Sequence, residues 1–164
     1  MNQLAELRIE RVDYRNPQQG EHLLMLLDNY ARDPMGGGEP ISDRVRRDLL
    51  PLLKVTPQAV SFIAYLGAEA VGLLNAFETV STFAARPLIN IHDLAVQPSV
   101  RGQGVGRRLI EALAEHARSR NCCKLTLEVL TGNHSAIGLY ENLGFEGYAL
   151  DPAMGSGIFM QKKL

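Results

Sequence analysis

The 164-residue sequence has few of the features that mark secreted, membrane-spanning or nucleic-acid-binding proteins. Its only two cysteines, Cys122 and Cys123, are adjacent, so they provide neither a disulfide framework nor the ligand spacing of a metal site. No apolar run approaches the length of a membrane span, and residues 1–6 lack the basic start and apolar stretch of a secretory signal. The net charge of −1 provides no basic surface for nucleic acid. We therefore expect a cytoplasmic protein that binds no metal, nucleic acid or membrane.

Two common phosphate-binding signatures are also absent. No run of Gly, four residues, Gly-Lys and Ser or Thr occurs, which excludes a P-loop. Gly102 and Gly104 begin a G-x-G pattern, but Arg107 stands where a dinucleotide fingerprint needs its third glycine. Neither a P-loop nucleotide site nor a dinucleotide site is therefore expected.

The sequence does contain an apolar strand that leads through a proline into a glycine-rich turn. Residues 94–106 read Leu-Ala-Val-Gln-Pro-Ser-Val-Arg-Gly-Gln-Gly-Val-Gly, and an amphipathic helical pattern follows at once. The N–H groups at a helix start are unpaired and lie at the positive end of the helix dipole, so they can bind an anion. Glycines allow a phosphate to approach the backbone. The segment predicts a pyrophosphate cradle, although the pattern alone also fits an ordinary strand-to-helix turn.

A second motif lies downstream, over residues 133–145, which read Asn-His-Ser-Ala-Ile-Gly-Leu-Tyr-Glu-Asn-Leu-Gly-Phe. Together the two segments resemble the GNAT superfamily of acyl-CoA-dependent N-acyltransferases. Residues 101–106 match its (Q/R)-x-x-G-x-(G/A) signature, and residues 133–145 match its second signature in the same order and spacing. The resemblance is strong over residues 89–145 and looser over the remaining chain. It implies acetyl-CoA as co-substrate and leaves the acceptor open.

The composition and periodicity predict a fold of the same kind. A hydrophobic content of 46% and a charged content of 21% are typical of a globular protein, and we expect a single domain over residues 1–164. The element order β-α-α-β-β-β-α-β-α-β-β predicts an α/β (α+β) fold in which helices cover a mixed sheet. This agrees with the fold that the resemblance implies, a GNAT-like fold with a mixed, mostly antiparallel central sheet of about seven strands flanked by four helices. The strands are expected at 7–14, 60–66, 70–79, 88–96, 124–130, 146–150 and 157–162, and the helices at 23–30, 42–53, 104–120 and 134–143.

The resemblance also implies which residues bind the acyl donor. The backbone of Leu94, Ala95 and Val96 would pair with the pantetheine amides, and one N–H there would stabilise the oxyanion. Asn133 would contact the pantetheine arm, and Tyr140 would act as general acid toward the departing sulfur. From the residues alone, Asn133 also fits a helix cap and Tyr140 an aromatic core residue. The residues expected to hold the pyrophosphate are Arg101, Gly102, Gln103, Gly104, Val105 and Gly106.

The group that receives the amine proton is less evident. His92 and Asp93 precede the cradle, and they point to opposite faces of a regular strand unless a bulge intervenes. A neutral histidine can accept the amine proton, while Asp93 can instead attract a cationic substrate. Glu78, late in the preceding strand, is a third candidate. Both His92 and Asp93 also fit purely structural roles, and a water chain can replace a single base.

These observations predict an N-acetyltransferase that moves an acetyl group from acetyl-CoA to a primary amine by direct attack in a ternary complex. The expected acceptor is a small amine. A protein N-terminus, a CoA-binding sensor or interaction module without turnover, and a structural domain without a ligand remain alternatives. The resemblance also leaves a homodimer open.

Overall fold

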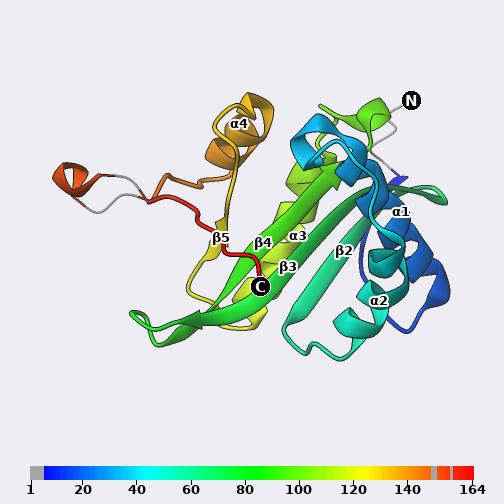
Figure 1. Ribbon diagram of the computed structural model, residues 1–164, viewed down its shortest axis with the longest axis horizontal. Helices are drawn as coiled ribbons and strands as arrows, with labels where there is room; N and C mark the ends of the chain where they lie inside the picture. The colour runs from blue at the N-terminus through cyan, green and yellow to red at the C-terminus, as the bar shows by residue number, and fades with distance from the viewer. Residues whose placement is uncertain (1–5, 149–150, 156) are drawn as a thin grey trace. The chain divides into compact units, whose positions relative to one another are not determined.

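A computed structural model describes residues 6–148, 151–155 and 157–164 of the chain (Figure 1). The chain divides into two compact units, Met1–Leu127 and Glu128–Leu164. The described residues contain four α-helices and a five-stranded sheet, so the expected mixed α/β class is confirmed while the strand count is lower than expected. No helix in these residue ranges is long and apolar enough to cross a membrane.

The first unit contains the sheet and three of the helices. The strand order is β1-β2-β3-β4-β5; the first three pairings are antiparallel and the β4–β5 pairing is parallel. Two 3-10 turns, η2 and η3, follow α1 and β4. The bounds are β1 (Leu7–Arg11), α1 (Pro17–Arg32), η2 (Pro34–Gly36), α2 (Asp43–Lys54), β2 (Ala59–Leu66), β3 (Glu69–Ser81), β4 (Arg86–Val96), η3 (Pro98–Val100), α3 (Val105–Ser119) and β5 (Leu125–Leu127).

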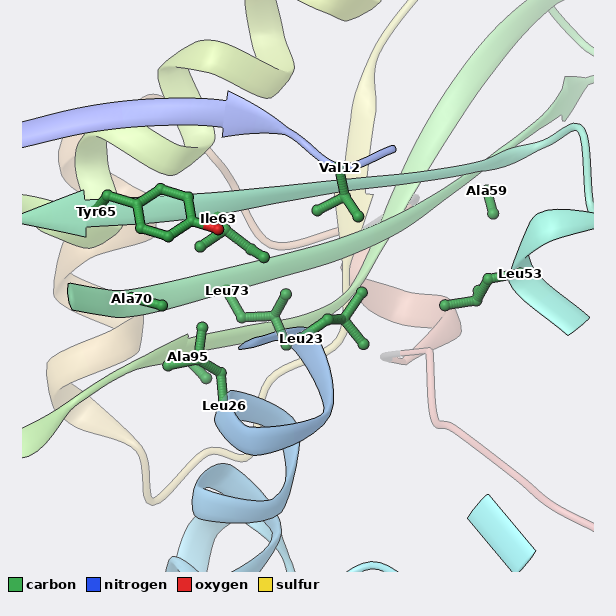
Figure 2. Packing of buried hydrophobic residues seen from close by; sticks show 10 residues of the cluster. All are labelled: Val12, Leu23, Leu26, Leu53, Ala59, Ile63, Tyr65, Ala70, Leu73 and Ala95. Carbon is green, nitrogen blue, oxygen red and sulfur yellow. The ribbon is translucent and has the colours of Figure 1, made fainter. Parts of the chain in front are cut away.

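Alternation along β3 assigns the two faces of this sheet. A Cβ built on Gly72 would lie 3.0 Å from side-chain atoms of both Val105 and Leu109, so α3 packs closely on this face. Leu73 points to the opposite face, where it packs with Leu23 of α1. Both leucines are fully buried, and such burial contributes roughly 1.5–3 kcal/mol for each side chain. Figure 2 shows this α1-side core, which consists of Val12, Leu23, Leu26, Leu53, Ala59, Ile63, Tyr65, Ala70, Leu73 and Ala95.

Asp28 joins the last turns of α1 to the start of α2. Its carboxylate accepts a hydrogen bond from the Ile41 N–H (3.0 Å) and forms ion pairs with Arg32 (3.0 Å) and Arg46 (2.7 Å). Burial alone would raise the pKa of Asp28, but these three donors outweigh it and the pKa lies below its usual value. The polar cluster therefore fixes the segment that connects the two helices.

The second unit contains α4 (His134–Asn142) and a 3-10 turn, η4 (Pro152–Met154). After α4, Gly144 adopts a φ of +84°, its N–H donates to Glu141 O, and the Phe145 N–H donates to Tyr140 O. These two bonds form a Schellman motif, which explains why this helix stops at a glycine followed by an apolar residue.

The two closing strands expected at 146–150 and 157–162 are wrong for the residues that the structure describes. Residues 146–148 and 157–162 form no strand, and residues 149–150 lie outside the described ranges. A strand needs a hydrogen-bonded partner, which a local apolar pattern cannot supply. The side chains of Ile158 and Phe159 are 79% and 78% exposed. The strand expected at 124–130 is also shorter, because only Leu125–Leu127 pairs with β4.

Candidate active site

The cradle, residues 101–106, forms a tight turn into α3. Gly102 and Gly104 have φ values of +75° and +83°, in the left-handed region that favours glycine. The first helical hydrogen bond runs from the Arg108 N–H to Gly104 O (3.1 Å), and Gly104 has no side chain that could cap the N–H groups of residues 105–107. A Cβ built on either glycine would meet no atom within 4 Å. The N-terminus of α3 is thus open to an anion.

Arg101 makes contacts that the sequence did not indicate. Its Nε donates to Val96 O (3.0 Å) and its Nη2 donates to the Asp33 carboxylate (2.9 Å), just after α1. The Met35 N–H and the Arg101 guanidinium hold the pKa of Asp33 below its usual value. Arg101 therefore ties the cradle to the end of α1, which is a different role from lending its charge freely to an anion.

Among the described residues, no strand pairs with the part of β4 beyond Ile91 on the edge that faces β5; we call this part of β4 its open edge. β4 pairs with β5 only as far as Ile91, although it continues to Val96. The Gln97 N–H donates to Val71 O of β3 (2.9 Å). Along an antiparallel pair of strands, hydrogen-bonded residue pairs alternate with pairs that are not hydrogen-bonded. By this alternation the backbone groups of Leu94 and Val96 point to the open edge, whereas those of Ala95 point to β3. The backbone groups of Leu94 and Val96 are therefore directed so that they could pair with the pantetheine amides, whereas those of Ala95 are directed away from that edge.

A β-bulge at His92 changes the direction of the side chains before this edge. Asn75 of β3 pairs with Asp93, and the next residue, Ala76, pairs with Ile91, so His92 is the extra residue. In a regular strand, His92 and Asp93 would point to opposite faces of the sheet, and the sequence left open whether a bulge intervenes. Because a bulge is present, both side chains can point to the same face.

Both side chains lie on the α1 side of the sheet. The His92 ring contacts the Phe77 ring edge-on, with centroids 4.8 Å apart, and Phe77 packs against the α1-side core. The Asp93 carboxylate accepts a hydrogen bond from Asn75 Nδ2 (3.0 Å). Burial, followed by the negative charges of Asp93 and Asp33, raises the pKa of Tyr30 near the end of α1. The structure therefore brings two of the three candidate bases together on the α1 side of the sheet.

Glu78 lies on the other face of the sheet. It has the same parity as Gly72, so its side chain points to the α3 side, where both carboxylate oxygens accept hydrogen bonds from Arg120 (2.9 and 3.0 Å). These hydrogen bonds hold the pKa of Glu78 below its usual value. A paired carboxylate with a lowered pKa is a weak base. Glu78 therefore lies on the opposite face of the sheet from His92 and Asp93 and is poorly suited to accept the amine proton.

The remaining two candidates, Asn133 and Tyr140, lie in the second unit. Asn133 Oδ1 accepts a hydrogen bond from the Ala136 N–H (3.2 Å), which confirms its role as the cap of α4. The Tyr140 ring, which is partly buried, lies 5.8 Å from the Phe145 ring. Their contacts with the pantetheine arm and the departing sulfur remain predictions.

Several residues of the site were not singled out by the sequence. Asn75 and Ser61 are nearly fully buried polar residues, 5% and 1% exposed, on the central strands. Each is a single polar residue within an apolar run, which is a signal that was present in the sequence. Asp33, the partner of Arg101, carried no comparable signal because the pair joins positions far apart in the chain. Within the described ranges, no three His, Cys, Asp or Glu side chains gather closely enough to hold a metal ion.

Named acetyltransferases are similar to this chain in sequence, and a solved structure is similar to it in fold. Streptothricin acetyltransferase from Streptomyces lavendulae is 39% identical over 97 residues, which cover 59% of this chain and 50% of the relative. N-alpha-acetyltransferase RimI from Mycobacterium tuberculosis is 34% identical over 88 residues, which cover 52% and 54%. The chain thus spans about half the length of these two relatives. The structure of aminoglycoside N-acetyltransferase AAC(6')-Iy in complex with CoA matches with a TM-score of 0.73 at 22% identity, over 96% of this chain and 95% of that one.

The structural match confirms the GNAT-like fold that the two sequence motifs implied. The family model described as the acetyltransferase (GNAT) family matches residues 23–145, a range that includes the cradle, the bulge of β4 and the second motif. Because this range is well over half of the sequence, the chain belongs to the acetyltransferase (GNAT) family.

Proposed function

We propose that the chain is an acyl-CoA-dependent N-acetyltransferase that moves an acetyl group from acetyl-CoA to a primary amine by direct attack in a ternary complex. The acceptor in this proposal is a small amine. The observation that carries it is the uncapped N-terminus of α3 next to the open edge of β4. The N-terminus of α3 provides N–H donors for a pyrophosphate. The open edge of β4 provides a strand with which an extended, amide-containing arm can pair.

The residues of the cradle fit the phosphate end of acetyl-CoA. A Cβ built on Gly102 or Gly104 would meet no atom within 4 Å, so phosphate oxygens can approach the backbone N–H groups there. The side chain of Val105 is buried under the sheet, so its contribution is its N–H. Arg101 supports the turn through Val96 and Asp33. Binding in this proposal is therefore mainly a backbone property.

The open edge of β4 then positions the reacting group. Acetyl-CoA supplies a thioester whose carbonyl carbon is open to attack. The N–H groups of Leu94 and Val96 point to this edge, and a fixed N–H donor at a developing negative charge is worth roughly 3–4 kcal/mol in enzymes of this kind of chemistry. Tyr140 is the proposed proton donor for the departing sulfur, because a phenol is ordinarily protonated at neutral pH, and Asn133 is the proposed contact of the arm.

The α1 side of the bulge is the proposed acceptor side. An amine reacts only as the neutral form, because an ammonium has no lone pair. His92 is exposed, and its ring is held by an edge contact with Phe77, so it can accept the amine proton directly or through water. Asp93 lies beside it and contributes a negative charge that attracts cationic amines.

The relatives support an amine acceptor and also define the range to be tested. One of them is named a streptothricin acetyltransferase and another an N-alpha-acetyltransferase. A panel of streptothricin, an aminoglycoside, aliphatic amines and an alanine-initiated peptide therefore covers both classes. The assay is release of free thiol from acetyl-CoA, with mass spectrometry of the product.

Three results distinguish the alternatives. Acetylation of a small amine, with release of one thiol for each product, supports the proposal. A rise in melting temperature with acetyl-CoA but no turnover on any amine overturns it in favour of a CoA-binding module. No change in melting temperature with acetyl-CoA or CoA overturns the donor site as well, because a ligand that binds only the folded state must stabilise it.

A further inference from the structure

A chain of hydrogen bonds crosses the α1 side of the sheet and ends at Asp93. Tyr14 Oη lies 2.8 Å from Ser61 Oγ, Ser61 Oγ lies 2.6 Å from Asn75 Oδ1, and Asn75 Nδ2 lies 3.0 Å from Asp93 Oδ2. Ser61 and Asn75 are nearly fully buried, and Tyr14 and Asp93 are partly buried. These hydrogen bonds thus connect the segment before α1 with the bulge of β4 through β2 and β3.

The direction of every bond in this chain is determined by chemistry. A carboxylate oxygen accepts, so Asn75 must donate its Nδ2 hydrogen to Asp93. The other amide atom, Asn75 Oδ1, can only accept, so Ser61 must donate its single hydroxyl hydrogen to it. Ser61 Oγ has then no hydrogen left, so Tyr14 donates to it. All donors therefore point toward the Asp93 carboxylate, and such aligned bonds strengthen one another.

This series of hydrogen bonds cannot carry a proton to or from Asp93. Its middle member is an amide, which accepts at one atom and donates at another but does not exchange protons readily as a hydroxyl or an imidazole does. Its effect is therefore to fix the carboxylate: Oδ2 is held by Asn75, while Oδ1 makes no hydrogen bond to any described residue. Asp93 presents one oxygen with a set direction on the expected acceptor side.

A negative charge held in this way stabilises an ammonium group that pairs with it and so opposes loss of its proton. The nitrogen that attacks the thioester must lose its proton. A nitrogen paired with Asp93 would therefore be a different one from the nitrogen that attacks the thioester.

We propose that Tyr14, Ser61 and Asn75 are positioning residues that hold Asp93 as the counter-ion of a second, non-reacting cationic group, and that the acceptor is accordingly a diamine or polyamine-like cation. This inference rests on the proposed function and specifies the acceptor of the same site.

Diamines and their matching monoamines provide the acceptor probes. The series runs from diaminopropane to diaminohexane, and each diamine is compared with the monoamine of the same chain length. We expect the wild-type protein to acetylate its best diamine with a kcat/KM at least about tenfold above that of the monoamine, since a charge-assisted hydrogen bond supplies such a factor. The difference should lie in KM.

Variants of the chain of hydrogen bonds test the positioning role. Ser61→Ala should raise the diamine KM about fivefold, and Tyr14→Phe, one bond further away, about twofold, with kcat, its pH profile and the KM for acetyl-CoA unchanged. Tyr65→Phe is the matched control: Tyr65 also lies on the α1 side of β2 and its hydroxyl bonds to His22 Nδ1 (3.1 Å), outside the chain. It should leave the diamine KM unchanged.

A readout without an acceptor separates this inference from the proposed function. In nitrogen-15 spectra, the side-chain amide of Asn75 should shift in Ser61→Ala and Tyr14→Phe and remain in place in Tyr65→Phe. These shifts together with the KM changes support the proposal. Equal diamine and monoamine kinetics, a fall in kcat instead of a rise in KM, or equal effects of Tyr65→Phe and Tyr14→Phe would each overturn it. Absence of turnover on every amine in the wild-type protein overturns the proposed function, while the amide shifts still report on the hydrogen bonds.

Discussion

The bulge lies within β4 and the cradle follows the end of that strand, but the two regions are built in opposite ways. The cradle offers N–H groups on a turn that glycines allow, and its side chains point elsewhere: Val105 into the core and Arg101 to Asp33. The bulge offers side chains, His92 and Asp93, whose directions depend on strand register and on buried neighbours. A site made of backbone depends on local sequence, whereas a site made of side chains depends on the packing of the whole sheet.

The largest expected effect comes from removing the charge on the bulge. Asp93→Asn keeps the shape of the side chain, and the amide oxygen can still accept from Asn75. The substitution removes the negative charge, so kcat/KM for the best diamine should fall about 100-fold. Loss of the free energy of one charge-assisted hydrogen bond corresponds to a factor of this size. Acetyl-CoA affinity by calorimetry should stay within about twofold of wild type. A parallel loss of acetyl-CoA affinity would show that the two regions are not separate in function.

Tyr140→Phe tests whether the donor side needs a side chain in addition to the backbone. Loss of the phenol hydroxyl should lower kcat at least about tenfold, because general acid catalysis typically contributes 10²–10⁴-fold. Acetyl-CoA binding should remain near normal, and the ring contact with Phe145 is retained. Stopped-flow turnover on the best amine measures the effect. An unchanged kcat would remove Tyr140 from the mechanism.

Gly104→Ala tests the backbone character of the cradle. A side chain at a φ of +83° is strained by about 1–2 kcal/mol, and the new Cβ occupies the open space where phosphate is expected.

Gly67→Ala, in the β2–β3 turn at a φ of +57° and also in open space, is the matched control with similar strain. Both variants should melt at a lower temperature, but only Gly104→Ala should weaken CoA binding, by about fivefold, as loss of one phosphate-binding hydrogen bond implies. Equal CoA affinities in the two variants would contradict a pyrophosphate site at this turn.

The smallest effect is expected from Glu78→Gln on the α3 side. Because the Arg120 hydrogen bonds hold the pKa of Glu78 below its ordinary value of 4.5, the ion pair stabilises the fold above about pH 4.5 and loses this contribution as the pH falls through the lower, folded-state pKa. The pair is partly exposed and screened by solvent, so the loss of stability at pH 7 should be small.

Glu78→Gln and wild type should therefore differ slightly in melting temperature at pH 7 and converge in acid, with amine acetylation within about twofold of wild type. A loss of activity comparable to that of Asp93→Asn would return Glu78 to the list of bases.

Much of the fold was predictable because its signals are local. The helices over residues 104–120 and 134–143, and the glycine that ends the second of them, follow from apolar spacing and from backbone angles that glycine tolerates. The closing strands at 146–150 and 157–162 were wrong where the structure describes them, because alternation in sequence does not provide a partner strand. The failure lies in pairing, which is a non-local property.

The sequence by itself determined the cradle, since glycines at 102 and 104 and an uncapped helix start are properties of a few consecutive residues. Only the tertiary structure decided that a bulge places His92 and Asp93 on one side, that Arg101 is bound to Asp33, and that Glu78 faces α3. It also brought together the hydrogen bonds that run through Ser61 and Asn75 to Asp93. Side-chain direction in a sheet depends on register, and register depends on strands that are distant in the chain.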